Sequence, residues 1–271
     1  MNEKPSVTII GTGAVGSALL HFFEKEGFTI VSGWNSTSGY PSSSSELGDL
    51  VFVTTPDDLI SDVALHLSRV KTEWSSRTVI HCSGNLSSEI FSGLYVLGAS
   101  TLSMHPIQTF RRGDDSTRFQ NIFASLEGDE PAIEKIKPLV ELMGASPLIV
   151  NNRQKRMIHL AAVMASNYLV SLMDLVDQMM KKEALGDGLQ VLKPLIDQTF
   201  KNIFDKGTTE SLSGPISRGD SGVVETHMVQ PCLSEDYLEA YKVLGRQAVQ
   251  IAERRGDLTP NEAEKIRSLL R

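Results

Sequence analysis

The fold of this chain is decided near its N-terminus, where residues 6–16 read Ser-Val-Thr-Ile-Ile-Gly-Thr-Gly-Ala-Val-Gly. The β-branched run at residues 6–10 predicts a short buried strand. The glycines that follow have the spacing G-x-G-x-x-G, and residues 14–26 then carry apolar side chains at helical spacing. Gly27 ends this pattern, as a glycine after the last helical residue does. The stretch therefore predicts a strand, a tight glycine turn and a helix in direct succession.

The glycine loop predicts a dinucleotide site, because it lies directly between a strand and a helix. In that context the first glycine allows the turn, the second lets the backbone approach a pyrophosphate, and the third lets the helix pack on the strand. The helix N-terminus offers N–H donors and positive partial charge to the phosphates. A tight turn without a ligand is the alternative. The residues expected to bind the cofactor here are Gly11, Thr12, Gly13, Ala14, Val15 and Gly16.

The rest of the chain divides into a region of alternating strands and helices and a region of helices alone. Apolar segments predict further strands at residues 29–34, 50–54, 78–82, 101–104, 122–126 and 147–150. With helices between them, these predict a Rossmann domain, an α/β doubly wound and mostly parallel sheet, over residues 1–152. Helical patterns follow at 153–182, 189–204, 235–254 and 260–270, with an irregular segment at 208–230. We therefore predict an all-α domain for substrate binding and dimerisation over residues 153–271.

Composition and charge exclude several classes of protein. The chain has 26 basic and 33 acidic side chains in 271 residues, and the acidic excess lies entirely in residues 1–152. Neither half has the basic excess of a nucleic-acid-binding protein. The longest uncharged apolar run, residues 157–173, is shorter than the roughly 20 residues of a membrane span. Two distant cysteines predict a reduced, cytoplasmic protein, and the scattered histidines and cysteines predict no metal site.

The end of the second predicted strand bears on the choice between NAD and NADP. An NAD site usually places Asp or Glu there to accept hydrogen bonds from the ribose hydroxyls. This chain has Asn35, Ser36 and Thr37 after Trp34. These side chains would donate to a 2′-phosphate, which a carboxylate would repel. The pattern predicts NADP, with NAD as the alternative cofactor and an ordinary polar loop as the alternative interpretation.

Small and polar residues follow the third and fourth predicted strands, at the sheet edge where open α/β sheets bind ligands. Thr54, Thr55 and Pro56 follow the third strand, and Ser83 follows the fourth. We expect them to border the ribose and nicotinamide of the cofactor. Turn chemistry alone predicts similar residues. His81, inside the fourth strand, is expected in the core.

Candidate catalytic side chains come from the fifth strand and the first helix after the sheet. His105 ends the strand and would polarise a carbonyl or move a proton, or else bond a backbone group. Lys155 and His159 are four residues apart and share a helix face. Ser166 returns to that face about three turns later, and Asn167 lies beside it. Polar groups on an apolar helix need partners, and a substrate between the domains would supply them. Hydrogen bonds between helices are the alternative.

With these motifs, the chain resembles the 6-phosphogluconate-dehydrogenase-like superfamily of NADP-linked oxidoreductases. That superfamily includes β-hydroxyacid dehydrogenases, pyrroline-5-carboxylate reductase and prephenate dehydrogenase, and the chain is most similar to bacterial Rossmann-like members with their own C-terminal helical domain. Lys155 occupies the position of the catalytic Lys of the β-hydroxyacid dehydrogenases, and His159 stands where they have Asn. The resemblance implies oxidoreductase chemistry and a homodimer built through the helical domain. It is carried by residues 11–16, 81–84, 104–110, 155–167 and 212–220.

Two hypotheses for function follow. The first is an NADP-dependent oxidoreductase that acts on a small carbonyl, imine or alcohol substrate between the domains. Lys155 or His159 would move the proton, with His105 as a second candidate, and Asn167 would orient the substrate. The second is a nucleotide-binding sensor or partner protein without turnover, because His159 departs from the Lys and Asn pattern. Arg218, in a segment expected to be a structured loop, would bind an anionic substrate or pin the loop by an ion pair.

Overall fold

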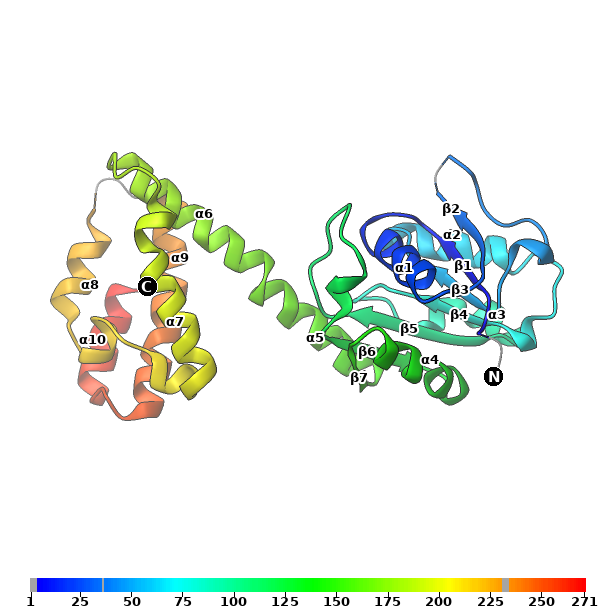
Figure 1. Cartoon of the computed structure of the whole chain (residues 1–271). Coiled ribbons are helices and arrows are strands. Elements are labelled where there is room, and N and C mark those ends of the chain that lie inside the picture. The colour runs from blue at the N-terminus through cyan, green and yellow to red at the C-terminus, as the bar shows by residue number, and fades with distance from the viewer. Residues whose placement is uncertain (1–3, 36, 231–233) are drawn as a thin grey trace. The chain divides into compact units, whose positions relative to one another are not determined.

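The computed structural model describes residues 4–35, 37–230 and 234–271. The chain forms two compact units, Met1–Ala165 and Ser166–Arg271, and Figure 1 shows the elements of each. The boundary predicted after residue 152 lies at the start of helix α5 (Asn152–Ala165). The first unit includes this helix, because the side chain of Lys155 on α5 is buried and donates a hydrogen bond to the carbonyl of Ser83.

The first unit is built on a seven-stranded sheet with the strand order β2-β1-β3-β4-β5-β6-β7. Neighbouring strands are parallel throughout, except that β5 and β6 are antiparallel. The predicted α/β fold is confirmed, and every predicted strand is present with its ends shifted by a residue or two. The strands are β1 (Val7–Ile10), β2 (Ile30–Trp34), β3 (Leu50–Val53), β4 (Thr78–His81), β5 (Ser100–Pro106), β6 (Phe123–Gly128) and β7 (Ser146–Ile149).

Helices cover both faces of this sheet, because alternate side chains along each strand point to opposite sides. Ile9 and Phe52 pack in one core cluster with residues of α1 and α4, whereas Val51 and Val53 pack in a second cluster with α2 and α3. Between β4 and β5 the chain forms a 3-10 turn (Ser88–Phe91) followed directly by α3. The helices are α1 (Ala14–Lys25), α2 (Asp57–Leu67), α3 (Ser92–Val96) and α4 (Glu130–Leu142).

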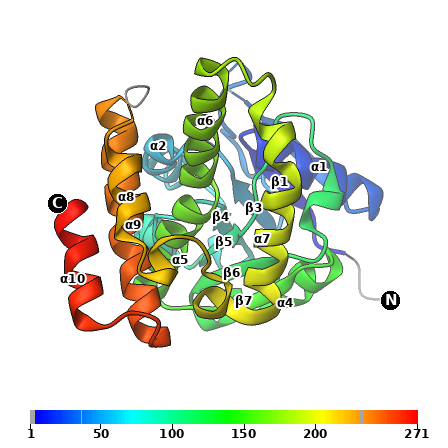
Figure 2. The same ribbon diagram turned by 90° about the vertical axis from the view of Figure 1, so that its left-hand side faces the viewer.

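The second unit is helical, as predicted. Its core lies between α8, α9 and α10, whose side-by-side arrangement is visible in Figure 2. The prediction of an irregular segment over residues 208–230 is wrong for α8, which the carboxylate of Asp220 caps by accepting from the N–H of Val223 at 3.1 Å. The helices are α6 (Asn167–Lys182), α7 (Gly188–Ser211), α8 (Ser221–Met228), α9 (Glu235–Arg255) and α10 (Pro260–Leu269).

The helical stretch predicted over residues 153–182 is present as two helices, α5 and α6. They are separated at Ser166, whose φ of −120° and ψ of −68° are not helical. By length and composition alone, the stretch Asn152–Lys182 is apolar enough to cross a membrane. One such stretch is weak evidence for a membrane protein, because a helix that packs between subunits has the same composition.

Candidate dinucleotide and proton-transfer site

The glycine loop after β1 is packed as tightly as its sequence predicts. Gly11 has a φ of +103°, and its N–H donates to the carbonyl of Trp34 at 2.8 Å. A Cβ atom at Gly11 would lie 2.6 Å from the carbonyl carbon of Thr54, and one at Gly16 would lie 2.6 Å from the Thr54 hydroxyl. That hydroxyl donates to the carbonyl of Gly11. Glycine is therefore required at both positions for the turn, α1 and the end of β3 to pack together.

Gly13 differs from its two neighbours, because a Cβ atom there would meet nothing within 4 Å. Gly13 is the N-cap residue of α1, and no side chain caps this helix. The first turn of α1 contains no acidic residue. Its N–H groups and the positive end of the helix therefore adjoin open space at Gly13, which fits a bound phosphate.

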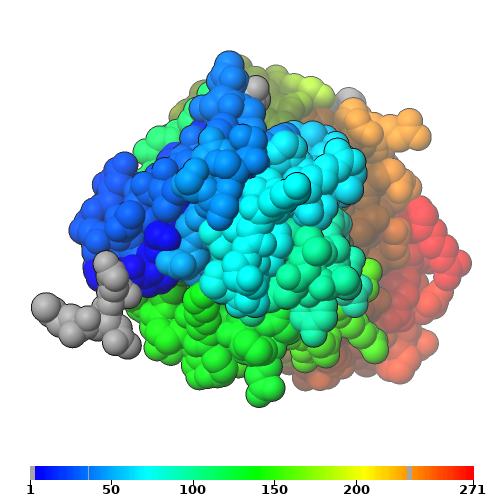
Figure 3. Space-filling model, turned by 90° about the vertical axis from the view of Figure 1, so that its right-hand side faces the viewer, coloured from blue at the N-terminus to red at the C-terminus, as the bar shows by residue number. Residues whose placement is uncertain are grey.

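The loop after β2 carries the residues predicted to select the cofactor. It projects from the first unit (Figure 1 and Figure 3), and Asn35 and Thr37 are exposed on it. The side-chain oxygen of Asn35 accepts from the N–H and the hydroxyl of Thr37, at 2.9 and 2.6 Å. Ser36 lies outside the described residues. The first acidic side chain after β2, Glu46, caps the following turn by accepting from the N–H of Ser43 at 2.9 Å.

Ser83, at the end of β4, joins several elements of the first unit. Its hydroxyl donates to the carboxylate of Asp57 at 2.7 Å and accepts from the N–H groups of Asn85 and Leu86. Asp57 is the first residue of α2. The N-cap residue is Pro56, which makes no side-chain cap, and the Asp57 carboxylate bonds Ser83. The hydroxyl of Ser83 is thus occupied within the protein.

The hydroxyl of Thr55, just before Pro56, is buried and has no hydrogen-bond partner among the described residues. A buried hydroxyl without a partner marks a place where a bound group would supply one.

Lys155 is buried deeply for a charged side chain. Only 1% of it is exposed, and its ammonium donates to the carbonyl of Ser83. Burial lowers the pKa of Lys155 from 10.5 to about 8, against the opposing effect of the Glu127 and Asp57 carboxylates. The group is therefore mostly protonated near neutral pH, and its proton is held less tightly than that of an exposed lysine.

Two imidazole rings converge on Gly84, directly after Ser83. The rings of His105 and His159 lie 5.8 Å apart in an edge-to-face arrangement. A Cβ atom at Gly84 would lie 2.8 Å from Nε2 of His105 and closer still to Nδ1 of His159. Burial and the positive charge of Lys155 lower the pKa of His105 to about 4, and its Nδ1 has no hydrogen-bond partner among the described residues. His105 is therefore neutral near neutral pH.

His81 is the core residue that its position in β4 predicts. It is fully buried, its Nδ1 accepts from the N–H of Ser83 at 3.2 Å, and burial lowers its pKa to about 3.

The sequence interpretation missed Glu127 of β6, which is 8% exposed. Its carboxylate accepts from the N–H and hydroxyl of Ser88, at 2.8 and 3.0 Å, and from the hydroxyl of Ser87 at 3.1 Å. An acidic residue directly after the predicted strand at residues 122–126 was the signal that could have found it. Glu127 holds the segment after β4 and helps to keep Lys155 charged.

The structure brings Lys155, His159 and His105 together around the end of β4, whereas Ser166 and Asn167 of the predicted stripe belong to the second unit. There Asn167 opens α6, and its side-chain oxygen accepts from the hydroxyl of Ser166 at 2.8 Å. The segment around Arg218 is a structured turn, as expected, with Gly219 in the left-handed region at a φ of +71°.

Comparison with known proteins supports the fold. Residues 122–248 match a family described as a domain of unknown function, DUF2520. No curated protein matches the chain significantly. A crystal structure of a protein from Thermotoga maritima is 26% identical, covers 92% of this chain and 99% of that one, and gives a TM-score of 0.68.

Two more distant structures are described by their cofactor or activity. A protein of Bacteroides fragilis described as a candidate NADP oxidoreductase is 17% identical, with coverage of 93% and 97% and a TM-score of 0.70. A reductive aminase from Aspergillus terreus, in complex with NADPH and ethyl levulinate, is 15% identical, with coverage of 97% and 98% and a TM-score of 0.59. These structures confirm the predicted fold, a Rossmann sheet followed by a helical part.

Proposed function

We propose that the protein is an NADP-dependent oxidoreductase that acts on a small carbonyl, imine or alcohol substrate. The observation that carries the proposal is the open space at Gly13, at the uncapped N-terminus of α1 and between two glycines that have no such space. A pyrophosphate would receive N–H donors there from the first turn of the helix. The B. fragilis protein and the NADPH-bound reductive aminase, which share the fold, support this choice of cofactor.

The preference for NADP over NAD rests on the loop after β2. This loop offers the Asn35 amide and no carboxylate, since the first acid after β2, Glu46, is used as a cap. A carboxylate at the end of β2 would repel the 2′-phosphate of NADP, and its absence removes that repulsion.

Bound NADPH would supply the hydride for reduction of a carbonyl or imine, and the protein would supply binding, position and the proton. The proton would come from the cluster at the end of β4. Lys155 is the donor in this cluster, because it is mostly protonated near neutral pH. Neutral His105 and neighbouring His159 lie beside Gly84, where either ring would relay that proton from Lys155 to the substrate. Asn167 stays the candidate that orients the substrate.

A titration with NADPH tests the cofactor assignment, and Gly13→Ala is the decisive variant. The new methyl group meets no protein atom within 4 Å, so the variant should fold normally and bind NADPH at least tenfold more weakly. Gly93→Ala is the matched control, because a Cβ atom there also meets nothing and Gly93 lies in α3, away from the glycine loop. Equal NADPH affinity of Gly13→Ala and the wild type would refute the site.

Turnover separates an enzyme from a sensor. We expect loss of NADPH absorbance with at least one member of a panel of small aldehydes, ketones and imines. Tight NADPH binding without turnover across the panel would favour the second hypothesis, a sensor or partner protein whose shape responds to the redox state of the cofactor.

We also propose that the protein is a homodimer. Among the described residues, α6 has no buried side chain, and exposed apolar side chains line α5, α6 and α7. They include Met157, Leu160, Val170, Val191 and Phe204. Monomeric proteins rarely leave large apolar patches uncovered, so these exposed side chains favour an interface between subunits. Sedimentation equilibrium should give twice the chain mass, and Leu160→Glu should shift the protein toward the monomer. The expected cytoplasmic location stays a prediction.

A further inference from the structure

The second unit contains a cavity that takes no part in the proposed cofactor site. Its volume is about 450 Å³, and it is lined by residues of α6, α8 and α9 and of the segment after α7. Small-molecule sites have volumes of about 300–1,000 Å³ and are lined mainly by apolar and aromatic side chains with a few polar groups. The size of this cavity therefore suits a small organic molecule.

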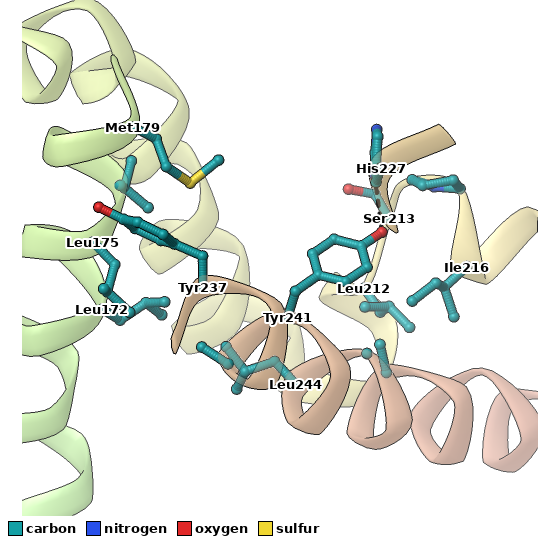
Figure 4. A pocket seen from close by; sticks show the side chains of 15 residues that line it. Leu172, Leu175, Met179, Leu212, Ser213, Ile216, His227, Tyr237, Tyr241 and Leu244 are labelled. Atoms are coloured by element: carbon teal, nitrogen blue, oxygen red, sulfur yellow. Dashed lines mark hydrogen bonds between the residues drawn. The ribbon is translucent and has the colours of Figure 1, made fainter. Parts of the chain in front are cut away.

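Two apolar helix stripes, one on α6 and one on α9, line the cavity (Figure 4). Leu172, Leu175 and Met179 recur at helical spacing on α6, and Tyr237, Tyr241 and Leu244 do so on α9. Tyr237 joins the two walls at one end, where its hydroxyl donates to the side-chain oxygen of Gln178 at 3.0 Å. The space of the cavity lies between this end and the end at which Tyr241 and His227 meet, as Figure 4 shows.

The polar groups of the cavity gather at the other end. Nδ1 of His227 and the hydroxyl of Tyr241 lie 2.9 Å apart, with their rings in an edge-to-face arrangement. Burial raises the pKa of Tyr241, so that the phenol stays neutral. The hydroxyl of Ser213 lines the same end. A tyrosine hydroxyl has both donor and acceptor capacity, so it can bond a ligand in addition to His227.

No Asp, Glu, Lys or Arg side chain is among the described residues that line the cavity. A charged ligand would lose its hydration there without gaining an ionic partner. A neutral ligand with one hydroxyl or carbonyl group would lose little, because that group would meet Tyr241 while its apolar part lay between the two stripes.

We propose that this cavity binds a small uncharged molecule with an apolar, aromatic or aliphatic body and one hydrogen-bonding group, which is placed against Tyr241 and His227. The site lies within the second unit, so the proposal does not depend on cofactor binding by the first. A helix of a second copy is the competing occupant. It fits less well, because apolar helix side chains would leave the remaining hydrogen-bonding capacity of Tyr241 unused.

Calorimetric titration of the full chain with 1-naphthol, without NADPH, tests the proposal, and 1-methylnaphthalene is the matched probe that lacks the hydroxyl. We expect one saturable site per chain for both probes. Tyr241→Phe should weaken 1-naphthol binding about three- to tenfold and leave 1-methylnaphthalene unchanged, because one hydrogen bond is lost. Tyr168→Phe is the control, since Tyr168 lies on α6, is exposed and does not line the cavity.

Ala240→Trp fills the cavity from α9 and should abolish binding of both probes. If this variant does not fold, the comparison between Tyr241→Phe and Tyr168→Phe decides. Absence of binding to the wild type would overturn the proposal, as would unchanged 1-naphthol affinity in Tyr241→Phe or in a folded Ala240→Trp. Conversion of a dimer to a monomer by Ala240→Trp would also overturn it, because a second copy would then occupy the cavity.

Discussion

Replacing Lys155 by Met should stabilise the first unit near neutral pH. Burial lowers the pKa of Lys155 from 10.5 to about 8, which corresponds to about 3 kcal/mol against folding while the group is protonated in both states. Methionine fills a similar volume without that charge. The variant also loses the hydrogen bond to the Ser83 carbonyl, which contributes about 1 kcal/mol. We therefore expect Lys155→Met to raise the free energy of unfolding by about 2 kcal/mol near pH 7.

The size of this effect should depend on pH. The folded-state pKa lies below the unfolded value, so the unfolded chain binds more protons between about pH 8 and 10.5, and wild-type stability rises across that interval. The advantage of Lys155→Met should therefore shrink to about zero near pH 10.

Urea titrations followed by tryptophan fluorescence measure this difference, because Trp34 and Trp74 both lie in the first unit. Lys135→Met, at an exposed position of α4, is the control. A difference that does not change with pH, or a variant several kcal/mol less stable near pH 7, would refute the assignment of Lys155 as a buried and perturbed charge.

Three further predictions concern the same unit. The pKa values of His105 and His81 are lowered to about 4 and 3, so the unfolded chain takes up protons below about pH 6.5 before the folded chain does. Urea titrations should therefore show the free energy of unfolding falling from about pH 6.5 toward pH 4, and this fall should be less steep in His105→Asn. Asn35→Asp should weaken NADPH binding and strengthen NADH binding. The ratio of the two dissociation constants, measured by titration with each cofactor, should change at least tenfold. Gly84→Ala should displace the imidazole of His159, changing its NMR resonances while NADPH affinity stays within about twofold, because Gly84 lies outside the glycine loop.

The first unit could be predicted closely because its strands are short, mainly apolar runs that alternate with helical patterns. The run at residues 6–10 and the glycines after it leave few alternatives, since only glycine fits the contacts at Gly11 and Gly16. The segment over 208–230 was harder, because its glycines mask a short helix. The N-cap residue Asp220 was the available signal for α8.

The site was predicted less completely, because it depends on which polar groups the fold buries together. The spacing of Lys155 and His159 showed that they share a helix face, but it did not show that Lys155 reaches the carbonyl of Ser83. Asp57 and Ser83 are 26 positions apart in the sequence, and only the packing of α2 beside the end of β4 reveals the bond between them. Such long-range pairs leave no periodicity in the sequence.

The protonation states around Ser83 give the strongest physical reason to regard this cluster as a site of chemistry. Lys155 and His105 are close enough for the charge of one to lower the pKa of the other. Their pKa values, about 8 and about 4, lie on opposite sides of neutral pH, so the cluster holds one proton donor and one neutral acceptor at the same time. Environments that separate the protonation of neighbouring groups in this way are typical of acid–base sites. A purely structural lysine would be expected to pair directly with a carboxylate, yet the Asp57 and Glu127 carboxylates bond Ser83, Ser87 and Ser88. The arrangement thus keeps the Lys155 ammonium charged and, among the described residues, bonded to one carbonyl. A substrate oxygen or nitrogen would be able to draw a proton from that ammonium.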